Sequence, residues 1–351
     1  MRLKEIEGWL RERDPARLDE LWRRADEVRR EAVGDGVHLR ALVEISNHCV
    51  EGCHYCGLRA GNRRVERYRM SADEILACAR RAAALGFGTL VLQAGTDPGL
   101  EAGWVVDLVR RIVAGQPLAV TLSLGEREEE ALAAWRRAGA ERYLLRFETS
   151  NVALYRRVHP DRPDRPSDRL RQLERLRALG YEVGTGMLVG LPGQTWGDLA
   201  ADLLLLAELD PDMIGLGPFL PHPHTPLGMH AGAAGAYEVP ADVETACKAI
   251  ALARLLCPLA NIPATTALAT LDPAGGRSAG LRCGANVVMP NLTPPGYRRL
   301  YDIYPGKASL AAEGEEDLVA LRAELGRLGR HVASGPGPSP AHARRLAGGR
   351  S

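Results

Sequence analysis

Residues 44–57 read EISNHCVEGCHYCG, and they directly follow the apolar run Leu39–Ile45. The cysteine spacing is C-x3-C-x2-C, on a loop that begins where a segment of strand length ends. Three thiolates on one tight loop can ligate three irons of a cubane, whereas closing a 4Fe–4S cluster with protein alone takes four cysteines. The spacing therefore indicates an iron–sulfur site at Cys49, Cys53 and Cys56 with one iron left open to an exogenous ligand.

Two other interpretations fit these residues. His48 or His54 could complete a four-ligand zinc site, and structural cysteines could cluster here without binding metal. The remaining cysteines fall in or beside predicted helices without partner spacing, and they are expected to be core thiols: Cys78, Cys247, Cys257 and Cys283.

Outward from this loop, apolar runs of strand length alternate with helical periodicity almost to the end of the chain. The predicted strands are Leu39–Ile45, Thr89–Gln93, Leu118–Ser123, Arg142–Arg146, Glu182–Val189, Met213–Gly217, Ile262–Thr266 and Asn286–Met289. The predicted helices are Ala72–Leu85, Gly103–Ala114, Glu128–Ala138, Arg169–Leu179, Thr195–Leu209, Val243–Leu256 and Gly276–Cys283. This alternation predicts an α/β protein of the (β/α)8 TIM-barrel type, which carries its chemistry at the carboxyl ends of the strands.

The domain organisation follows from this pattern. Residues 1–36 are expected to form N-terminal helices that cap the bottom of the barrel, and residues 37–312 form the barrel. Residues 313–351 should hold a charged helix at Glu315–Leu328 and then a disordered tail, because Gly335–Ser351 is rich in Pro, Gly and Arg.

Composition excludes several classes of function. The 351 residues carry a formal net charge of +1, which gives no reason to expect nucleic acid or an anionic membrane as partner. The N-terminus is charged and lacks the apolar region of a secretory signal, and no segment approaches the ~18 apolar residues of a membrane span. Crowded cysteines are poor material for a disulfide framework. We therefore expect a soluble, cytoplasmic protein.

The cysteine loop resembles that of the radical S-adenosylmethionine (SAM) superfamily, in which an aromatic residue, here Tyr55, precedes the last cysteine. The resemblance implies that the amino and carboxylate groups of SAM chelate the open iron. It also implies that an electron from the cluster splits SAM into methionine and a 5′-deoxyadenosyl radical.

Further runs narrow the resemblance to the HydE family, the radical-SAM maturases of FeFe hydrogenases; methylornithine synthases and biotin synthases are related families. These runs are CGLRAGN (56–62), ERYRM (66–70), VLQAG (91–95), VTLSLG (120–125), RYLLRFET (142–149), VGLPGQT (189–195), GPFLPHPHTP (217–226), PATTA (263–267), GANVVMP (284–290) and YRRLYDIYPGK (297–307). No cysteine follows Cys283, so a single cluster is expected.

The resemblance implies a set of SAM contacts: Tyr55, Gly95, Thr121, Ser123, Glu148, Arg169 and Met213. In this reading Glu148 holds the ribose hydroxyls, Arg169 faces the SAM carboxylate, and Met213 packs on the adenine or serves only as core. The loop after the second strand departs from the family, because Thr96 stands where these proteins usually have Glu. An inward charged pair such as Arg146 and Glu148 is costly unless it binds something, although the two could also simply satisfy each other.

The implied substrate contacts are Gln93, Arg146, Thr265, Thr266, Tyr297, Tyr301 and Tyr304, around a small carboxylated, sulfur-containing molecule. For the tyrosines, packing at the top of the barrel is the alternative.

The implied function is maturation of the hydrogenase diiron subsite, acting on a cysteine-bound iron complex from the partner maturase HydG. A reduced ferredoxin or flavodoxin-like donor is expected, and the basic run Arg59–Arg69 could dock it or be a solvated loop. The alternatives are a HydE-like enzyme on another small amino acid, as in methylornithine synthase, and a zinc-stabilised binding protein.

Overall fold

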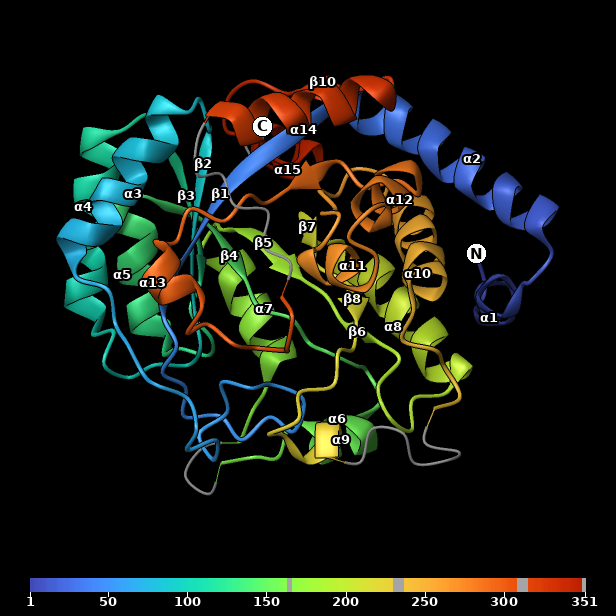
Figure 1. Ribbon diagram of the computed structural model, residues 1–351, viewed down its shortest axis with the longest axis horizontal. Helices are drawn as coiled ribbons and strands as arrows, with labels where there is room; N and C mark the ends of the chain where they lie inside the picture. The colour runs from blue at the N-terminus through green and yellow to red at the C-terminus, as the bar shows by residue number, and fades with distance from the viewer. Residues whose placement is uncertain (163–165, 230–236, 308–314, 349–351) are drawn as a thin grey trace.

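The computed structural model describes residues 1–162, 166–229, 237–307 and 315–348 (Figure 1). Its main sheet is parallel, and six of its strands pair in chain order: β1 (Gly36–Ser46), β2 (Thr89–Ala94), β3 (Ala119–Ser123), β4 (Ala140–Leu144), β5 (Glu182–Thr185) and β7 (Met213–Ile214). The helices that connect these strands are α3 (Ala72–Ala84), α4 (Ala102–Gly115), α5 (Glu129–Ala138), α6 (Val152–Val158), α7 (Arg169–Ala178) and α8 (Trp196–Leu209). This is the βα alternation that the sequence predicts.

Beyond β7 the ring returns to β1 through shorter pairings. Met213 bridges to Asn261, Pro263 bridges to Val287, and β9 (Val287–Val288) pairs in parallel with β1. The predicted strand Ile262–Thr266 is reduced to isolated bridges, because the proline within it has no N–H to donate to a ladder. The parallel barrel fold is thereby confirmed, with weak pairing in its last quarter.

Two short strands and five further helices complete the carboxyl end and the last quarter of the described barrel. A separate pair, β6 (Leu188–Val189) with β8 (Gly217–Pro218), extends the fifth and sixth strand positions. The other elements are α9 (Pro226–Met229), α10 (Val243–Leu256), α11 (Thr266–Leu271), α12 (Gly276–Arg282) and α13 (Pro295–Arg298). Among these, only α10 and α12 were predicted from periodicity. The others span too few residues to show a helical period.

Local signals in the sequence explain where the long helices begin. Ser71 and Glu74 form a reciprocal capping box at α3, and Thr195 and Asp198 do the same at α8. Each pair satisfies two amide groups that would otherwise lack acceptors. These caps fix the residues at which α3 and α8 begin.

The N-terminal helices α1 (Leu3–Arg11) and α2 (Pro15–Val33) do not lie across the bottom of the barrel as expected. They pack on the flank, α1 against α8 and α10 and α2 against α10. The cause is an apolar stripe on α1, where Ile6, Trp9 and Leu10 are buried in the same core cluster as the faces of α8 and α10.

The C-terminal segment covers the bottom instead, so the expectation of a disordered tail is wrong for the described residues. After α14 (Glu315–Arg327), strand β10 (His331–Val332) pairs with the start of β1, and α15 (Pro340–Gly348) follows. Figure 1 shows β10, α14 and α15 at one end of the barrel, and α6 and α9 at the other. Between β10 and α15, the Gly337 carbonyl accepts from Arg40 and Asn261, each at 3.2 Å. These main-chain contacts leave no hydrophobic signal in the sequence.

The expected boundary at residue 312 lies outside the described residues. No described helix combines the length and apolarity that crossing a membrane would require.

The lower interior of the barrel is filled by a buried ion pair. Arg142 Nε lies 2.5 Å from Glu182 Oε2, and Arg142 Nη1 donates to Thr89 at 2.9 Å. Glu182 Oε1 accepts from the amide of Ser339 in the C-terminal segment. The pair therefore joins β2, β4 and β5 to the segment that closes the bottom.

We predict that Arg142→Met destabilises the protein by about 3–5 kcal/mol, because it leaves the Glu182 carboxylate buried without a cation. Urea unfolding of the cluster-free protein measures this change. Arg111→Met is the matched control: its ion pair with Asp73 is exposed, so its loss should cost less than about 1 kcal/mol. Equal effects of the two substitutions would contradict a structural role for the buried pair.

Candidate active site

The cysteine loop leaves the carboxyl end of β1 and places three thiols at the mouth of the barrel. Cys53 is buried, Cys49 and Cys56 are half-buried, and none forms a disulfide. Burial raises the pKa of Cys53 well above its ordinary value, and the neighbouring Cys49 and Cys56 raise it further, so the three groups lie within electrostatic range. Backbone amides of Glu51 and Thr96 hydrogen-bond to Cys49, and that of Leu58 to Cys56.

These amide contacts test whether the loop suits an iron–sulfur cluster. Amide hydrogen bonds to sulfur stabilise thiolate ligands and tune such clusters, so the donor set fits. Among the described residues, no three His, Cys, Asp or Glu side chains, the three cysteines included, lie close enough together to hold a single metal ion.

Gly95, at the end of β2, packs directly on the first cysteine. A Cβ at this position would lie 2.6 Å from Cys49 Cβ and 2.8 Å from Cys49 Sγ. Both separations are far below van der Waals contact, so only glycine allows the strand end to approach the cysteine loop.

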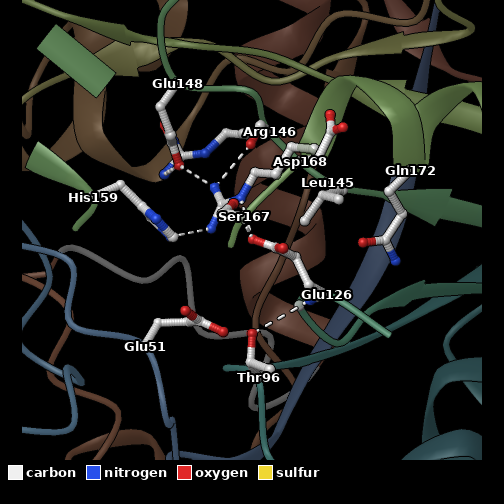
Figure 2. Close-up of polar contacts among 12 residues, drawn as sticks. Glu51, Thr96, Glu126, Leu145, Arg146, Glu148, His159, Ser167, Asp168 and Gln172 are labelled. Atoms are coloured by element: carbon white, nitrogen blue, oxygen red, sulfur yellow. Dashed lines mark hydrogen bonds and ion pairs between the residues drawn. The ribbon is translucent and has the colours of Figure 1, made fainter. Parts of the chain in front are cut away.

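Arg169 is a largely buried cation near the cysteine loop that joins three separate segments. From the first turn of α7 its Nε donates to Glu126 Oε1 at 3.0 Å, and its Nη1 donates to the Arg146 carbonyl at 2.9 Å. Its Nη2 lies 2.7 Å from His159 Nε2. Burial, and then the charge of Arg169, lower the pKa of His159 to about 3, so the imidazole is neutral and accepts this hydrogen bond. Figure 2 shows Glu126, Arg146 and His159 converging on one point.

Glu148 lies beside this network in a strained conformation. Its φ of 68° is in the left-handed region, which is costly for a residue other than glycine. Its Oε1 accepts from Tyr55 at 3.1 Å and lies 3.2 Å from Arg146 Nη2 and 3.5 Å from Arg169 Nη1. The alternative of a self-satisfied ion pair is therefore only half met, because Glu148 Oε2 is buried without a partner.

Several buried side-chain atoms inside the barrel have no hydrogen-bond partner. Two of them, Arg40 Nε and Arg142 Nη2, belong to the lower interior. Four more are oxygens: Glu44 Oε2, Thr121 Oγ1, Glu148 Oε2 and Thr265 Oγ1. Each comes from a different strand or strand position. Buried polar groups are nearly always satisfied, so a set of orphans calls for an explanation. A polar ligand rich in hydrogen-bonding groups, such as SAM together with a small substrate, would supply partners for the oxygens at the strand ends.

Three other predicted residues, Gln93, Ser123 and Thr266, also lie at strand ends or directly after them. Gln93 and Ser123 share one level of the sheet, because Glu44 pairs with Gln93 and Gln93 pairs with Ser123. Thr266 begins α11 directly after the orphaned Thr265.

Two of the predicted tyrosines also lie at the mouth of the barrel. Tyr301 is buried under Lys307, whose Nζ lies 4.8 Å from the ring centre. Burial raises the pKa of Tyr304 to about 12, with Arg146 and Glu44 also close enough to act on it.

Tyr297 is not in the barrel mouth as expected, and Met213 fits the second of its two predicted roles. Tyr297 lies outside the barrel, where its hydroxyl donates to Glu74 Oε1 at 2.8 Å and its ring packs on Tyr68. Met213 lies low in the barrel with its sulfur 2.8 Å from Arg40 Nη1, so it serves the core. Alternation along a strand cannot tell the upper layer of a barrel from the lower one.

The sequence reasoning also missed residues of the site. Glu126 and His159 hold Arg169, and Lys307 pairs with Glu44 at 2.6 Å in the barrel mouth. A glycine-glutamate pair after β3 was a weak signal for Glu126. Nothing in the local sequence singles out His159, whose partner is ten residues further along the chain.

Comparisons with known proteins agree with this geometry. The profile described as "Radical SAM superfamily" matches residues 43–206. The chain is 51% identical over 287 residues to the [FeFe] hydrogenase maturase subunit HydE of Thermotoga maritima, covering 82% of this chain and 79% of that one. It is 28% identical to 3-methylornithine synthase of Methanosarcina barkeri, covering 79% and 75% of the two chains.

Solved structures support the fold. A methylornithine synthase (PylB) superposes with a TM-score of 0.79 at 24% identity, covering 99% of this chain and 96% of that one. HydG from Carboxydothermus hydrogenoformans gives 0.76 at 20% identity, with 94% and 75% covered.

The barrel and its three-cysteine loop, together with these matches, define a radical SAM enzyme, a class whose cofactors are a 4Fe–4S cluster and SAM. Within that class, the chain belongs to the HydE family.

We predict that Gly95→Ala prevents full cluster loading, because the added methyl group would displace Cys49. After anaerobic reconstitution the wild type should hold about four irons per chain, and the variant should hold less than half as much, with weaker visible absorbance. Gly103→Ala is the matched control, since nothing lies within 4 Å of its added Cβ. Full iron loading of Gly95→Ala would contradict this prediction, because it would show that the end of β2 can move to accommodate the methyl group without displacing Cys49.

Proposed function

We propose that this chain matures the diiron subsite of an FeFe hydrogenase. The observation that carries the proposal is its 51% identity, over 82% of its length, to a HydE subunit whose name describes it as an [FeFe] hydrogenase maturase. We further propose that residues 37–312 carry the chemistry, while residues 1–36 and 313–351 support the barrel.

The cofactors would be held by the residues at the barrel mouth. Cys49, Cys53 and Cys56 would ligate the cluster, which when reduced supplies the electron that splits SAM and yields a 5′-deoxyadenosyl radical. Arg169, fixed by Glu126 and His159, keeps its charge in a buried position where it can face a carboxylate. Glu148 Oε2 is free to accept a ribose hydroxyl, and Tyr55 holds the other oxygen.

Three further residues complete the proposed SAM site. Gly95 lets the end of β2 approach the cluster loop, and Thr121 offers an unpartnered hydroxyl from β3. Ser123 stands two residues later on the same face of that strand. All lie in an interior from which bulk water is largely excluded, which protects a reactive radical.

The substrate would lie across the barrel mouth from the cluster. Arg146 offers a cation to a carboxylate, and Thr265, at another strand end, offers an unpartnered hydroxyl. Gln93, Thr266, Tyr301 and Tyr304 complete the proposed lining. These groups suit a small carboxylated, sulfur-containing molecule, and we propose a cysteine-bound iron complex delivered by HydG.

The electron donor would dock beside the cysteine loop. Arg63 and Arg64 are exposed there, and Arg59 is half-buried. A basic surface next to a redox centre favours association with a small acidic carrier such as reduced ferredoxin or flavodoxin.

We predict that the reconstituted protein, given SAM and dithionite, forms 5′-deoxyadenosine and methionine in equal amounts. Cys53→Ala should lower the rate by at least about 100-fold, since the cluster then lacks a ligand. Liquid chromatography of the quenched reaction measures both products. The radical mechanism would be contradicted by wild-type protein that holds its full iron and forms no 5′-deoxyadenosine. It would also be contradicted by a Cys53→Ala variant that forms as much 5′-deoxyadenosine as the wild type.

A second prediction concerns the substrate. In a defined mixture of HydG, the substrates of HydG and apo-hydrogenase, this protein should restore hydrogen evolution, whereas Cys53→Ala should not. Measuring hydrogen separates the maturase from an amino-acid mutase of the methylornithine synthase type. Protein that makes 5′-deoxyadenosine yet never activates the hydrogenase would favour the mutase.

A further inference from the structure

Glu51 is a buried carboxylate inside the cysteine loop itself. It stands between Cys49 and Cys53, and only 6% of the residue is exposed. Its backbone amide hydrogen-bonds to Cys49, as does that of Thr96. In Figure 2 the Glu51 side chain points inward to the Thr96 hydroxyl, with Glu126 opposite. A charged side chain of this kind rarely faces inward without a partner.

The other carboxylates around the cysteines are already engaged. Asp97 binds Arg69 through both oxygens, at 2.7 and 2.8 Å. Glu126 binds Arg169, and Glu148 contacts Tyr55 as well as two arginines. The charge of Arg169 is thus already shared between two other acids.

The contacts of Glu51 are weaker. The Thr96 side chain hydrogen-bonds to it, and the nearest ion-pair contact is to Arg162 at 4.0 Å, the outer limit for a salt bridge. Burial and the like-charged Glu126 raise the pKa of Glu51, and the charge of Arg169, which Glu126 and Glu148 share, lowers it less. Two inward carboxylates on one side of the cysteines call for a further donor or cation in the space between them. In the proposed reaction the group that arrives there is the amino acid end of SAM.

We propose that Glu51 accepts a hydrogen bond from the amino group of SAM, with Thr96 orienting its carboxylate. The inference rests on the proposed SAM site. Two features give this chain the arrangement. First, Thr96 has no carboxylate of its own, but its side chain hydrogen-bonds to the carboxylate of Glu51. Second, the backbone amides of Glu51 and Thr96 both hydrogen-bond to the sulfur of Cys49. The acidic acceptor for the amino group thus comes from the cluster loop.

The test is anaerobic calorimetry of the reconstituted protein with two ligands. SAM carries the amino group, whereas 5′-methylthioadenosine has the same nucleoside without the amino acid. Glu51→Gln should weaken SAM binding by about tenfold or more, the usual worth of a hydrogen bond to a charged group. Its affinity for 5′-methylthioadenosine should change less than about twofold. Glu66→Gln, the same change at an exposed glutamate of the same region, should alter neither.

The outcomes are distinct. Unchanged SAM affinity in Glu51→Gln would overturn the inference, and so would an equal loss for both ligands, because Glu51 would then only shape the loop. Wild-type protein with a full cluster that binds neither ligand would instead overturn the proposed SAM site, and this inference with it.

Discussion

The upper barrel is organised around one buried cation, Arg169. Its guanidinium joins the end of β3 through Glu126, the end of β4 through the Arg146 carbonyl, and the segment after α6 through His159. A guanidinium taken out of water needs all its donors satisfied. Meeting that need draws three separate loops to one point beside the cysteines. The strain at Glu148 lies at the same point, where surrounding contacts can hold an unfavourable backbone conformation.

The two ends of the barrel differ in what their side chains do. Near the bottom, Arg142 and Glu182 pair with each other and link the strands to Ser339 in the C-terminal segment, although Arg142 Nη2 has no partner there. At the other end, Glu148 Oε2 and Thr265 Oγ1 are also buried without a partner in the protein. Barrels of this type carry their chemistry at the carboxyl ends of the strands. The unpartnered groups at that end are where a bound ligand would complete the hydrogen bonding.

Sequence patterns predicted the parts of this protein that depend on local spacing. The C-x3-C-x2-C loop, the βα alternation and the long helices all appear within a few residues of their expected places. The failures involve direction and distance. Tyr297 points outward to Glu74, and the choice between the two predicted roles of Met213 depended on Arg40, because a residue's depth in a barrel depends on its neighbours across strands. The tail was missed because its bonds to Arg40 and Asn261 use the main-chain oxygen of Gly337.

The fold alone does not decide the reaction. A methylornithine synthase and a HydG superpose on this chain almost equally well, with TM-scores of 0.79 and 0.76, although their names describe different activities. A barrel supports many chemistries, and the differences lie in the side chains at its strand ends. In this chain those side chains include Glu51 facing Thr96, and Lys307 paired with Glu44 across the mouth. Side-chain differences at such positions, rather than the ring of strands, distinguish enzymes that share this fold.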